Sequence, residues 1–169
     1  MIKKIQKLDT PINQNENEIT IFKNEYSFLN NFYQRKIYYK GILFPTIEHA
    51  FQASKYENID EMKKISIIQN ALDAKKEGLL ITPTDYWIKN KNNIMFDLLN
   101  VKFNLYNRDL REKLIQTSGK NIINGNFYHD NYWGNCYCNK CSQINKLNII
   151  GKMLTLIREN IIYINSIGS

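Results

Sequence analysis

The sequence is short of glycine, of cysteine and of long apolar runs, and each shortage excludes a class of protein. Its 7 glycines are never grouped as a Rossmann turn or a P-loop requires, so neither nucleotide-binding fingerprint is present. No apolar stretch is long enough to cross a membrane, and the N-terminus lacks the apolar region and cleavage site of a signal peptide. An odd number of cysteines, 3, without an export signal favours reduced thiols and a cytoplasmic location.

The composition is that of an ordinary folded domain with a basic balance. With 169 residues, 43% of them hydrophobic, the chain predicts one domain over 19–162, an N-terminal arm at 1–18 and a C-terminal tail at 163–169. The net charge of +7 permits anionic partners such as nucleotides, phosphorylated sugars or nucleic acid. Because the lysines are scattered rather than clustered, the charge is equally consistent with a general abundance of lysine.

The order of the predicted elements favours an α+β fold, a helix-rich single domain with a small β-hairpin. Strands are predicted at 19–22 and 121–124, and a hairpin over 36–44 that turns at Lys40 and Gly41. Apolar periodicity predicts helices from 47 onward and at 60–80 with a break near 69–70, 92–106, 110–115 and 144–162. Asp60 and Asp73 are predicted helix caps, and 25–32, 82–87 and 125–142 are predicted loops.

Residues 44–55 (FPTIEHAFQASK) are the stretch around which the predicted fold is organised. Pro45 and Thr46 predict the helix start, because proline ends an extended segment and a threonine hydroxyl caps free N–H groups. Small or apolar residues share one face: Ile47, Ala50, Phe51 and Ser54. Polar residues recur at i, i+4 and i+7: Glu48, Gln52 and Lys55. This row is typical of a solvated helix face, but with His49 beside it and its start in the first helical turn it also fits a binding site.

The loop at 129–134 (HDNYWG) is a second candidate for ligand binding. Trp133 or Trp87 could stack on a planar base, and Asp130 could bind ribose hydroxyls or act on a water molecule. The other interpretation is that the tryptophans fill the core and that Asp130 only shapes a turn. Upstream, Asn30 or Asn31 is expected to be available for hydrogen bonding, with Phe28 and Phe32 packed inward.

Three cysteines and one histidine of the same segment have the ligand types of a zinc site. His129, Cys136, Cys138 and Cys141 supply four ligands and contain a C-x-C-x2-C pattern. A usual zinc motif pairs two separated knuckles, whereas here the thiols share one short loop, so reduced thiols without metal are the other interpretation. No cofactor is predicted for the activity itself.

Taken together, these segments resemble the NADAR family of YbiA-like N-glycosidases. The resemblance is carried, in order, by 28–32 (FLNNF), 44–55, Trp87, Lys102 with Phe103, 130–134 (DNYWG) and 148–152 (NIIGK). Six matching pieces in one order over some 125 residues are far more specific than any one of them. Phe44 stands where a tryptophan is common in the family, and the cysteine cluster replaces a glycine-rich loop.

The resemblance implies a YbiA-like fold and hydrolysis of the N-glycosidic bond between a ribose and a base or amine. Implied substrates are phosphoribosyl-amino intermediates of the riboflavin pathway or guanine-linked ADP-ribose, as a small molecule or carried on nucleic acid. By motif position it implies a functional set of Glu48, Trp87, Asp130 and Trp133, with Lys55 as a further catalytic candidate. Other motif positions complete the expected substrate-binding set: Asn31, Phe32, His49, Gln52, Gly134 and Lys152.

Two alternatives stay open at this point. Lys55 could form a Schiff base with an opened ribose, which needs a neutral amine, or could pair with a phosphate or carboxylate. The domain as a whole could instead be a non-catalytic module that binds ADP-ribose or NAD-like ligands in the same pocket.

Overall fold

The computed structural model describes residues 16–168, so most of the predicted arm at 1–18 lies outside the described residues. The α+β, helix-rich fold class is confirmed. In chain order the elements are β1 (Glu18–Ile19), η1 (Asn24–Leu29), β2 (Ile37–Tyr39), β3 (Ile42–Phe44), α1 (Ile47–Ala53), α2 (Ile59–Ser66), α3 (Ala71–Leu80), α4 (Asp85–Lys102), α5 (Arg108–Ile115), β4 (Asn121–Ile122), β5 (Gly125–Asn126), β6 (Asn135–Cys136), η2 (Asn139–Cys141) and α6 (Ile149–Ile167). Within 16–168, none of the helices combines the length and apolarity needed to cross a bilayer.

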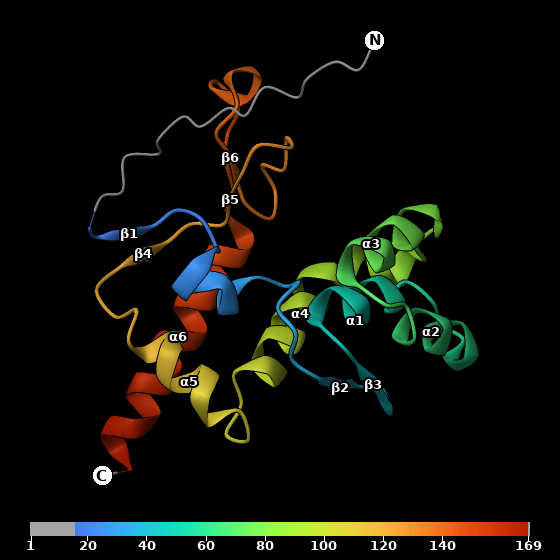
Figure 1. The fold of residues 1–169 in the computed structure, drawn as a ribbon, viewed down its shortest axis with the longest axis horizontal. Helices are drawn as coiled ribbons and strands as arrows, with labels where there is room; N and C mark the ends of the chain where they lie inside the picture. The colour runs from blue at the N-terminus through green and yellow to red at the C-terminus, as the bar shows by residue number, and fades with distance from the viewer. Residues whose placement is uncertain (1–15, 169) are drawn as a thin grey trace.

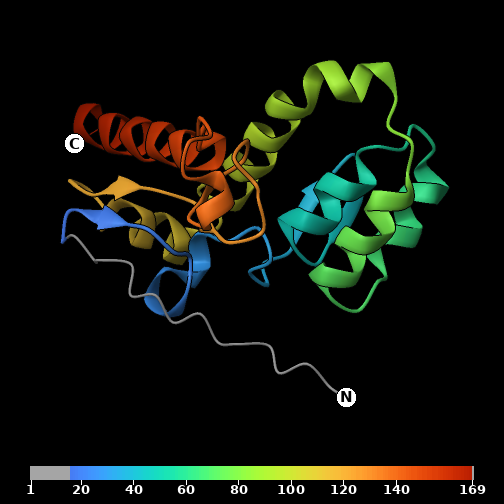
Figure 2. The ribbon, with the colours of Figure 1, turned by 90° about the horizontal axis from the view of Figure 1, so that it is seen from above.

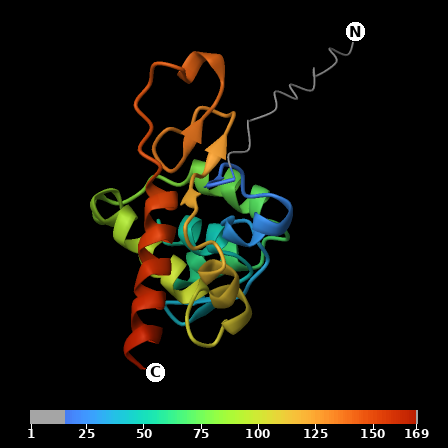
Figure 3. The ribbon, with the colours of Figure 1, turned by 90° about the vertical axis from the view of Figure 1, so that its left-hand side faces the viewer.

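The long helix α4 links two groups of elements. On one side α1 packs against α2 and α3, next to the β2–β3 hairpin; on the other side α5 and α6 lie with β1 and β4 (Figures 1 and 2). Helix α4 contacts α1, β2 and α6, and so touches both groups. The segment that carries β5, β6 and η2 projects beyond the N-terminal end of α6 (Figure 3).

The strands form three small sheets in the described part of the chain. The hairpin prediction is confirmed: β2 and β3 pair antiparallel, and the turn places Lys40 and Gly41 at positive φ, 47° and 79°. β1 pairs with β4, and β5 with β6, each in parallel. The predicted first strand at 19–22 is shortened to Glu18–Ile19, and the predicted loop at 25–32 contains the 3-10 helix η1.

Several helix boundaries differ from the sequence predictions. The caps of α2 and α3 are Asn58 and Asn70, whose side chains accept from the backbone N–H groups of Asp60 and Asp73; the two aspartates lie in the first turns instead. Helix α4 begins at Asp85 rather than 92, because the Thr84 hydroxyl accepts from Trp87 N at 3.2 Å.

The last helix is also shifted. It runs from Ile149 to Ile167 and so continues into the predicted tail. It starts later than predicted because Asn148 takes a left-handed conformation, φ 48°, immediately before it.

Every residue of α1 is buried, which makes this seven-residue helix the centre of the fold. Thr46 caps it as predicted, accepting from His49 N at 3.3 Å. The apolar face, including Ala50 and Phe51, belongs to one continuous core with side chains of α4 and α6. A solvated face, the ordinary interpretation of the polar row, is therefore wrong: Glu48 and Gln52 are each 6% exposed.

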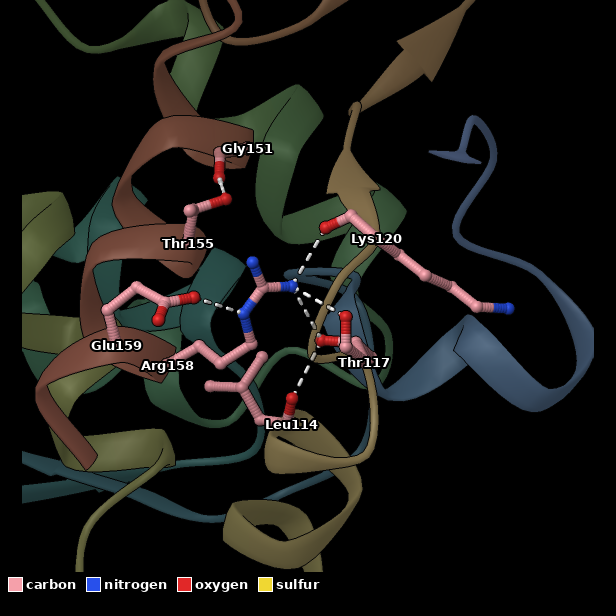
Figure 4. A network of polar contacts seen from close by, with 7 residues as sticks. All are labelled: Leu114, Thr117, Lys120, Gly151, Thr155, Arg158 and Glu159. Atoms are coloured by element: carbon pink, nitrogen blue, oxygen red, sulfur yellow. Dashed lines mark hydrogen bonds and ion pairs between the residues drawn. The ribbon is translucent and has the colours of Figure 1, made fainter. Parts of the chain in front are cut away.

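A buried arginine fastens α6 to the segment between α5 and β4 (Figure 4). Arg158 Nη1 donates to Thr117 O at 2.7 Å, to Thr117 Oγ1 at 3.1 Å and to Lys120 O at 2.9 Å. Its Nε pairs with Glu159 at 2.9 Å. One guanidinium thus satisfies three acceptors that have little access to water.

Replacing Arg158 by methionine is expected to lower the free energy of unfolding by about 3 kcal/mol, because it leaves these acceptors unpaired while keeping an apolar stem. Urea unfolding measures the change. The matched control is Arg111→Met, since the Arg111 guanidinium donates at 3.2 Å to the exposed Asn165 Oδ1. We expect the control to change stability by no more than about 0.5 kcal/mol; equal losses in the two variants would contradict the role given to Arg158.

Candidate active site

A pocket of about 390 Å³ opens beside α1, at the meeting of several elements. Helix α1 contributes Glu48, Phe51 and Gln52, and α3 contributes Lys75. The rest of the wall comes from α4, from α6 and from two irregular segments, at 21–32 and 124–133. The volume lies in the range of small-molecule sites.

Glu48 is a buried carboxyl at the inner wall of this pocket. The side chain of Gln52 donates from Nε2 to Glu48 Oε1 at 2.7 Å. The backbone N–H of Glu48 donates to Asn31 O at 3.1 Å. Burial raises the pKa of Glu48; the hydrogen bond from Gln52 and the positive charges of Lys75 and Lys55 oppose this, while Asp130 adds to it. The carboxyl therefore takes up a proton at a higher pH than an exposed glutamate does.

Two amide oxygens beside Glu48 accept no hydrogen bond from any described residue. These are Asn31 Oδ1 and Gln52 Oε1, both buried and both on residues that line the pocket. An unpaired buried acceptor costs about 1–3 kcal/mol, so each of these oxygens would be stabilised by a hydrogen-bond donor. Gly78 makes room for this arrangement, because a Cβ there would lie 2.0 Å from Gln52 Oε1.

Asp130 lines the same pocket from the segment between β5 and β6, and its carboxylate also stabilises the local backbone. Its Oδ1 accepts from Tyr132 N at 3.1 Å and from Trp133 N at 2.8 Å, which shapes the turn. The buried Asn126 holds the same turn, accepting from Asp130 N at 3.2 Å and donating to Asp130 O at 2.7 Å. Asn126, which sequence reasoning missed, also lines the pocket.

Both tryptophans pack against Phe51, but only Trp133 lines the pocket. Trp133 lines it, with its ring edge-to-face on Phe51 at a centroid distance of 5.4 Å. Trp87 packs on Phe51 at 5.2 Å, and its Nε1 donates to Ser54 Oγ at 2.9 Å. It is not among the pocket residues.

Of the two relevant lysines, Lys75 lines the pocket and Lys55 does not. Helix α1 ends at Ala53, so Lys55 leaves the polar row; its Nζ donates to Gly78 O at 2.5 Å and lies 5.3 Å from the Trp87 ring centroid. Lys75 Nζ lies 5.1 Å from the Tyr128 ring and 5.9 Å from the Phe32 ring. The sequence did not predict Lys75 as a site residue, although three small buried residues mark the inward face of α3: Ala71, Ala74 and Gly78.

His49, Gly134 and Lys152 also lie outside the pocket lining, whereas Asn31 and Phe32 are part of it. His49 is fully buried, with Nδ1 2.8 Å from Thr46 Oγ1 and Nε2 3.1 Å from Ile68 O. Because the carbonyl can only accept, Nε2 carries the proton, and burial lowers the pKa of the ring, which is therefore neutral. A Cβ on Gly134 would lie 2.1 Å from Asn124 O, and Lys152 is exposed on α6.

The four candidate metal ligands do come together in space. The ligand atoms of His129, Cys136, Cys138 and Cys141 all lie within 4.8 Å of one another. None of the four lines the pocket, but His129 directly precedes Asp130, which does.

Comparison with known proteins agrees with this architecture. N-glycosidase Npun_R5314 of Nostoc punctiforme is 30% identical over 141 residues, 80% of this chain and 86% of that protein. The riboflavin biosynthesis protein PYRR, chloroplastic, of Zea mays is 27% identical over 131 residues, 70% of this chain but 20% of that longer protein. The NMR structure of the E. coli protein YbiA has the same fold, with a TM-score of 0.74 at 24% identity over 90% of this chain and 89% of that one.

The NADAR domain matches residues 13–162, which include every residue of the pocket described above. Since that match spans far more than half of the sequence, the chain belongs to the NADAR domain family.

Proposed function

We propose that this protein hydrolyses the N-glycosidic bond between a phosphate-bearing ribose and a base or amine. The observation that carries the proposal is the position of Glu48: a buried carboxyl that shares one pocket with Asp130, Lys75 and Trp133. The relative named N-glycosidase supports the same reaction class.

The reaction needs negative charge beside the sugar. As the bond from the anomeric carbon to nitrogen breaks, its electron pair leaves with the nitrogen and positive charge develops on the ribose ring. A carboxylate in a pocket of low polarity stabilises that charge strongly. Water then bonds to the anomeric carbon, one of its protons passes to Glu48, and Glu48 passes that proton on to the departing nitrogen, which yields free ribose and free base or amine and restores the carboxylate.

The polar groups around Glu48 suit the sugar. Asn31 and Gln52 line the pocket, and a small movement of their side chains would let their unpaired oxygens accept from ribose hydroxyls. Asp130, whose Oδ1 is occupied by backbone N–H groups, would offer its other oxygen to the same sugar. Trp133, Phe32 and Tyr128 supply aromatic surface against which a planar leaving group can lie.

The proposed substrates are phosphoribosyl-amino intermediates of the riboflavin pathway and guanine-linked ADP-ribose. The first class is supported by the relative named for riboflavin biosynthesis, and both carry phosphate that Lys75 can bind.

The test is to incubate the purified protein with each substrate class and to follow released base or amine and ribose by mass spectrometry. We expect release from at least one class. No release from either class, together with measurable binding of ADP-ribose, would instead assign the domain as a non-catalytic binding module.

Lys75 is proposed as the amine that acts on the substrate. Replacing it by alanine is expected to lower kcat/KM by about 10- to 100-fold, the worth of one charge-assisted hydrogen bond. The matched control is Lys76→Ala, since the neighbouring Lys76 is exposed and paired with Asp73 at 2.8 Å. Equal kinetics for the two variants would remove Lys75 from the site.

Borohydride reduction during turnover distinguishes the two ways in which an amine can act. A sugar-mass adduct that is lost in Lys75→Ala assigns this lysine as a nucleophile that forms a Schiff base. No adduct in the wild type assigns it as the partner of the phosphate. An adduct that persists in Lys75→Ala and disappears in Lys55→Ala would return the role to Lys55 and contradict the proposal.

A further inference from the structure

We propose that His129, Cys136, Cys138 and Cys141 bind one Zn²⁺ ion, in a structural site that fixes the segment between β5 and α6. The site lies beside the pocket and is independent of the glycosidase proposal. Its evidence is the meeting of four ligands that are separated by up to twelve residues of largely irregular chain.

The dimensions of the cluster are those of a tetrahedral zinc site. Zn–S bonds of about 2.3 Å and Zn–N bonds of about 2.0 Å place tetrahedral N···S pairs about 3.6 Å apart and S···S pairs about 3.8 Å apart. His129 Nδ1 lies 3.2 Å from Cys138 Sγ and 3.4 Å from Cys141 Sγ, and no pair of ligand atoms exceeds 4.8 Å. Adjustments of about 1 Å or less would therefore enclose the ion.

The ligand types select zinc and a structural role. Three thiols and one imidazole form the Cys₃His set of structural zinc sites, whereas magnesium and calcium prefer oxygen ligands. Four protein ligands complete a tetrahedron. A catalytic zinc site needs an open position for a reacting water molecule, and this set leaves none. The three cysteines are free thiols, so none is withdrawn from the set by a disulfide.

The backbone is folded so that the four side chains converge. Cys136 belongs to β6, and the turn of η2 brings Cys141 back to Cys138, with Cys141 N donating to Cys138 O at 3.0 Å. His129 has φ 68°, a left-handed conformation that costs free energy in a residue with a side chain. A bond from its imidazole to a metal would offset that cost.

The segment at 125–142 contains little regular secondary structure. It contains two strands of two residues and one short 3-10 turn, and Phe127 and Tyr128 are 44% and 63% exposed. Small units without sufficient core are commonly stabilised by a structural metal. Because His129 adjoins Asp130, this ion would also hold one wall of the pocket in place.

The test is metal content, measured by native and elemental mass spectrometry on full-length protein expressed with added zinc. We expect about one zinc ion per chain in the wild type and in the control Ser142→Ala, and almost none in Cys138→Ser or His129→Ala. Replacement by Co²⁺ should give thiolate-to-cobalt absorption and the intense visible bands of a tetrahedral site. Chelation of the wild-type metal should lower the melting temperature, which tests the site even where a ligand variant fails to fold.

Two results would overturn the inference. One is metal-free wild type whose melting temperature does not respond to chelator or to added zinc. The other is a mass two hydrogens below that of the reduced chain, which would show that two of the thiols have joined in a disulfide. Neither result depends on the glycosidase activity, so failure of that proposal would leave the zinc site unaffected.

Discussion

Glu48→Gln is expected to lower kcat/KM for the N-glycoside substrate by about 10²- to 10⁴-fold, the range for loss of a general base or of charge stabilisation in a transition state. Glutamine keeps the size of the side chain but not its negative charge. Because the pKa of Glu48 is raised by burial, the wild-type rate should increase with pH through a value above the ordinary 4.5 of a glutamate, as the active carboxylate forms. The variant should lose that dependence.

The control for this prediction is Glu77→Gln, an exposed carboxylate on α3 that does not line the pocket. Steady-state kinetics across acidic and neutral pH, with circular dichroism to verify folding, measure both variants. A folded Glu48→Gln protein with wild-type kinetics would show that the buried carboxyl has no part in the chemistry.

Lys102 is expected to make the stability of the protein depend on pH in the alkaline range. Its side chain is fully buried at the end of α4, with Nζ donating to Asn30 O at 2.7 Å and lying over the rings of Tyr33 and Phe103. Burial, with a smaller effect from the charge of Arg35, lowers the pKa of this amine from 10.5 to about 7. No ion pair found among the described residues includes it.

The sign follows from proton uptake on unfolding. Between about pH 7 and pH 10.5 the unfolded chain keeps this amine protonated while the folded chain leaves it neutral, so the unfolded state binds more protons and stability rises with pH. The free-energy cost of burying the Lys102 amine is greatest below about pH 7 and falls as the pH approaches 10.5. Between pH 7 and pH 10 the free energy of unfolding of the wild type should rise by about 3 kcal/mol relative to that of Lys102→Met.

Urea unfolding at a series of pH values, for wild type and Lys102→Met, measures this gain. The methionine variant also leaves Asn30 O unpaired, but that loss is constant with pH and does not affect the slope. Lys113→Met, an exposed lysine on α5, should follow the wild type. Identical slopes for wild type and Lys102→Met would mean that the buried amine titrates as it does in water.

The elements that the sequence predicted well are those with strong local signals. Pro45 and Thr46 fixed the start of α1, and Gly41 fixed the hairpin turn, because a cap and a positive φ depend on adjacent residues. The cysteine spacing indicated a cluster for the same reason. The caps of α2 and α3 were harder to predict. Asparagine and aspartate cap helices about equally well, so the nearby sequence does not decide between Asn58 and Asp60, or between Asn70 and Asp73.

The parts of the site that were missed depend on contacts between distant elements. Whether Glu48 faces water or a cavity is decided by helices that pack around α1, and periodicity within α1 carries no information about them. Lys55 was predicted from a helix that was assumed to continue, whereas α1 ends at Ala53. Lys75, which lines the pocket, belongs to another helix, and only the packing of α3 on α1 brings it near.

The shortness of α1 has a consequence for the order in which the protein gains activity during synthesis. A helix of seven residues is too short to persist alone in water, where about 12–15 residues are needed. Glu48 leaves the ribosome early, in a segment that has no stable structure of its own. Asp130 and Trp133 emerge some eighty residues later. Nascent chains that stop before α6 should carry the acid but have no enclosed cavity in which it can act.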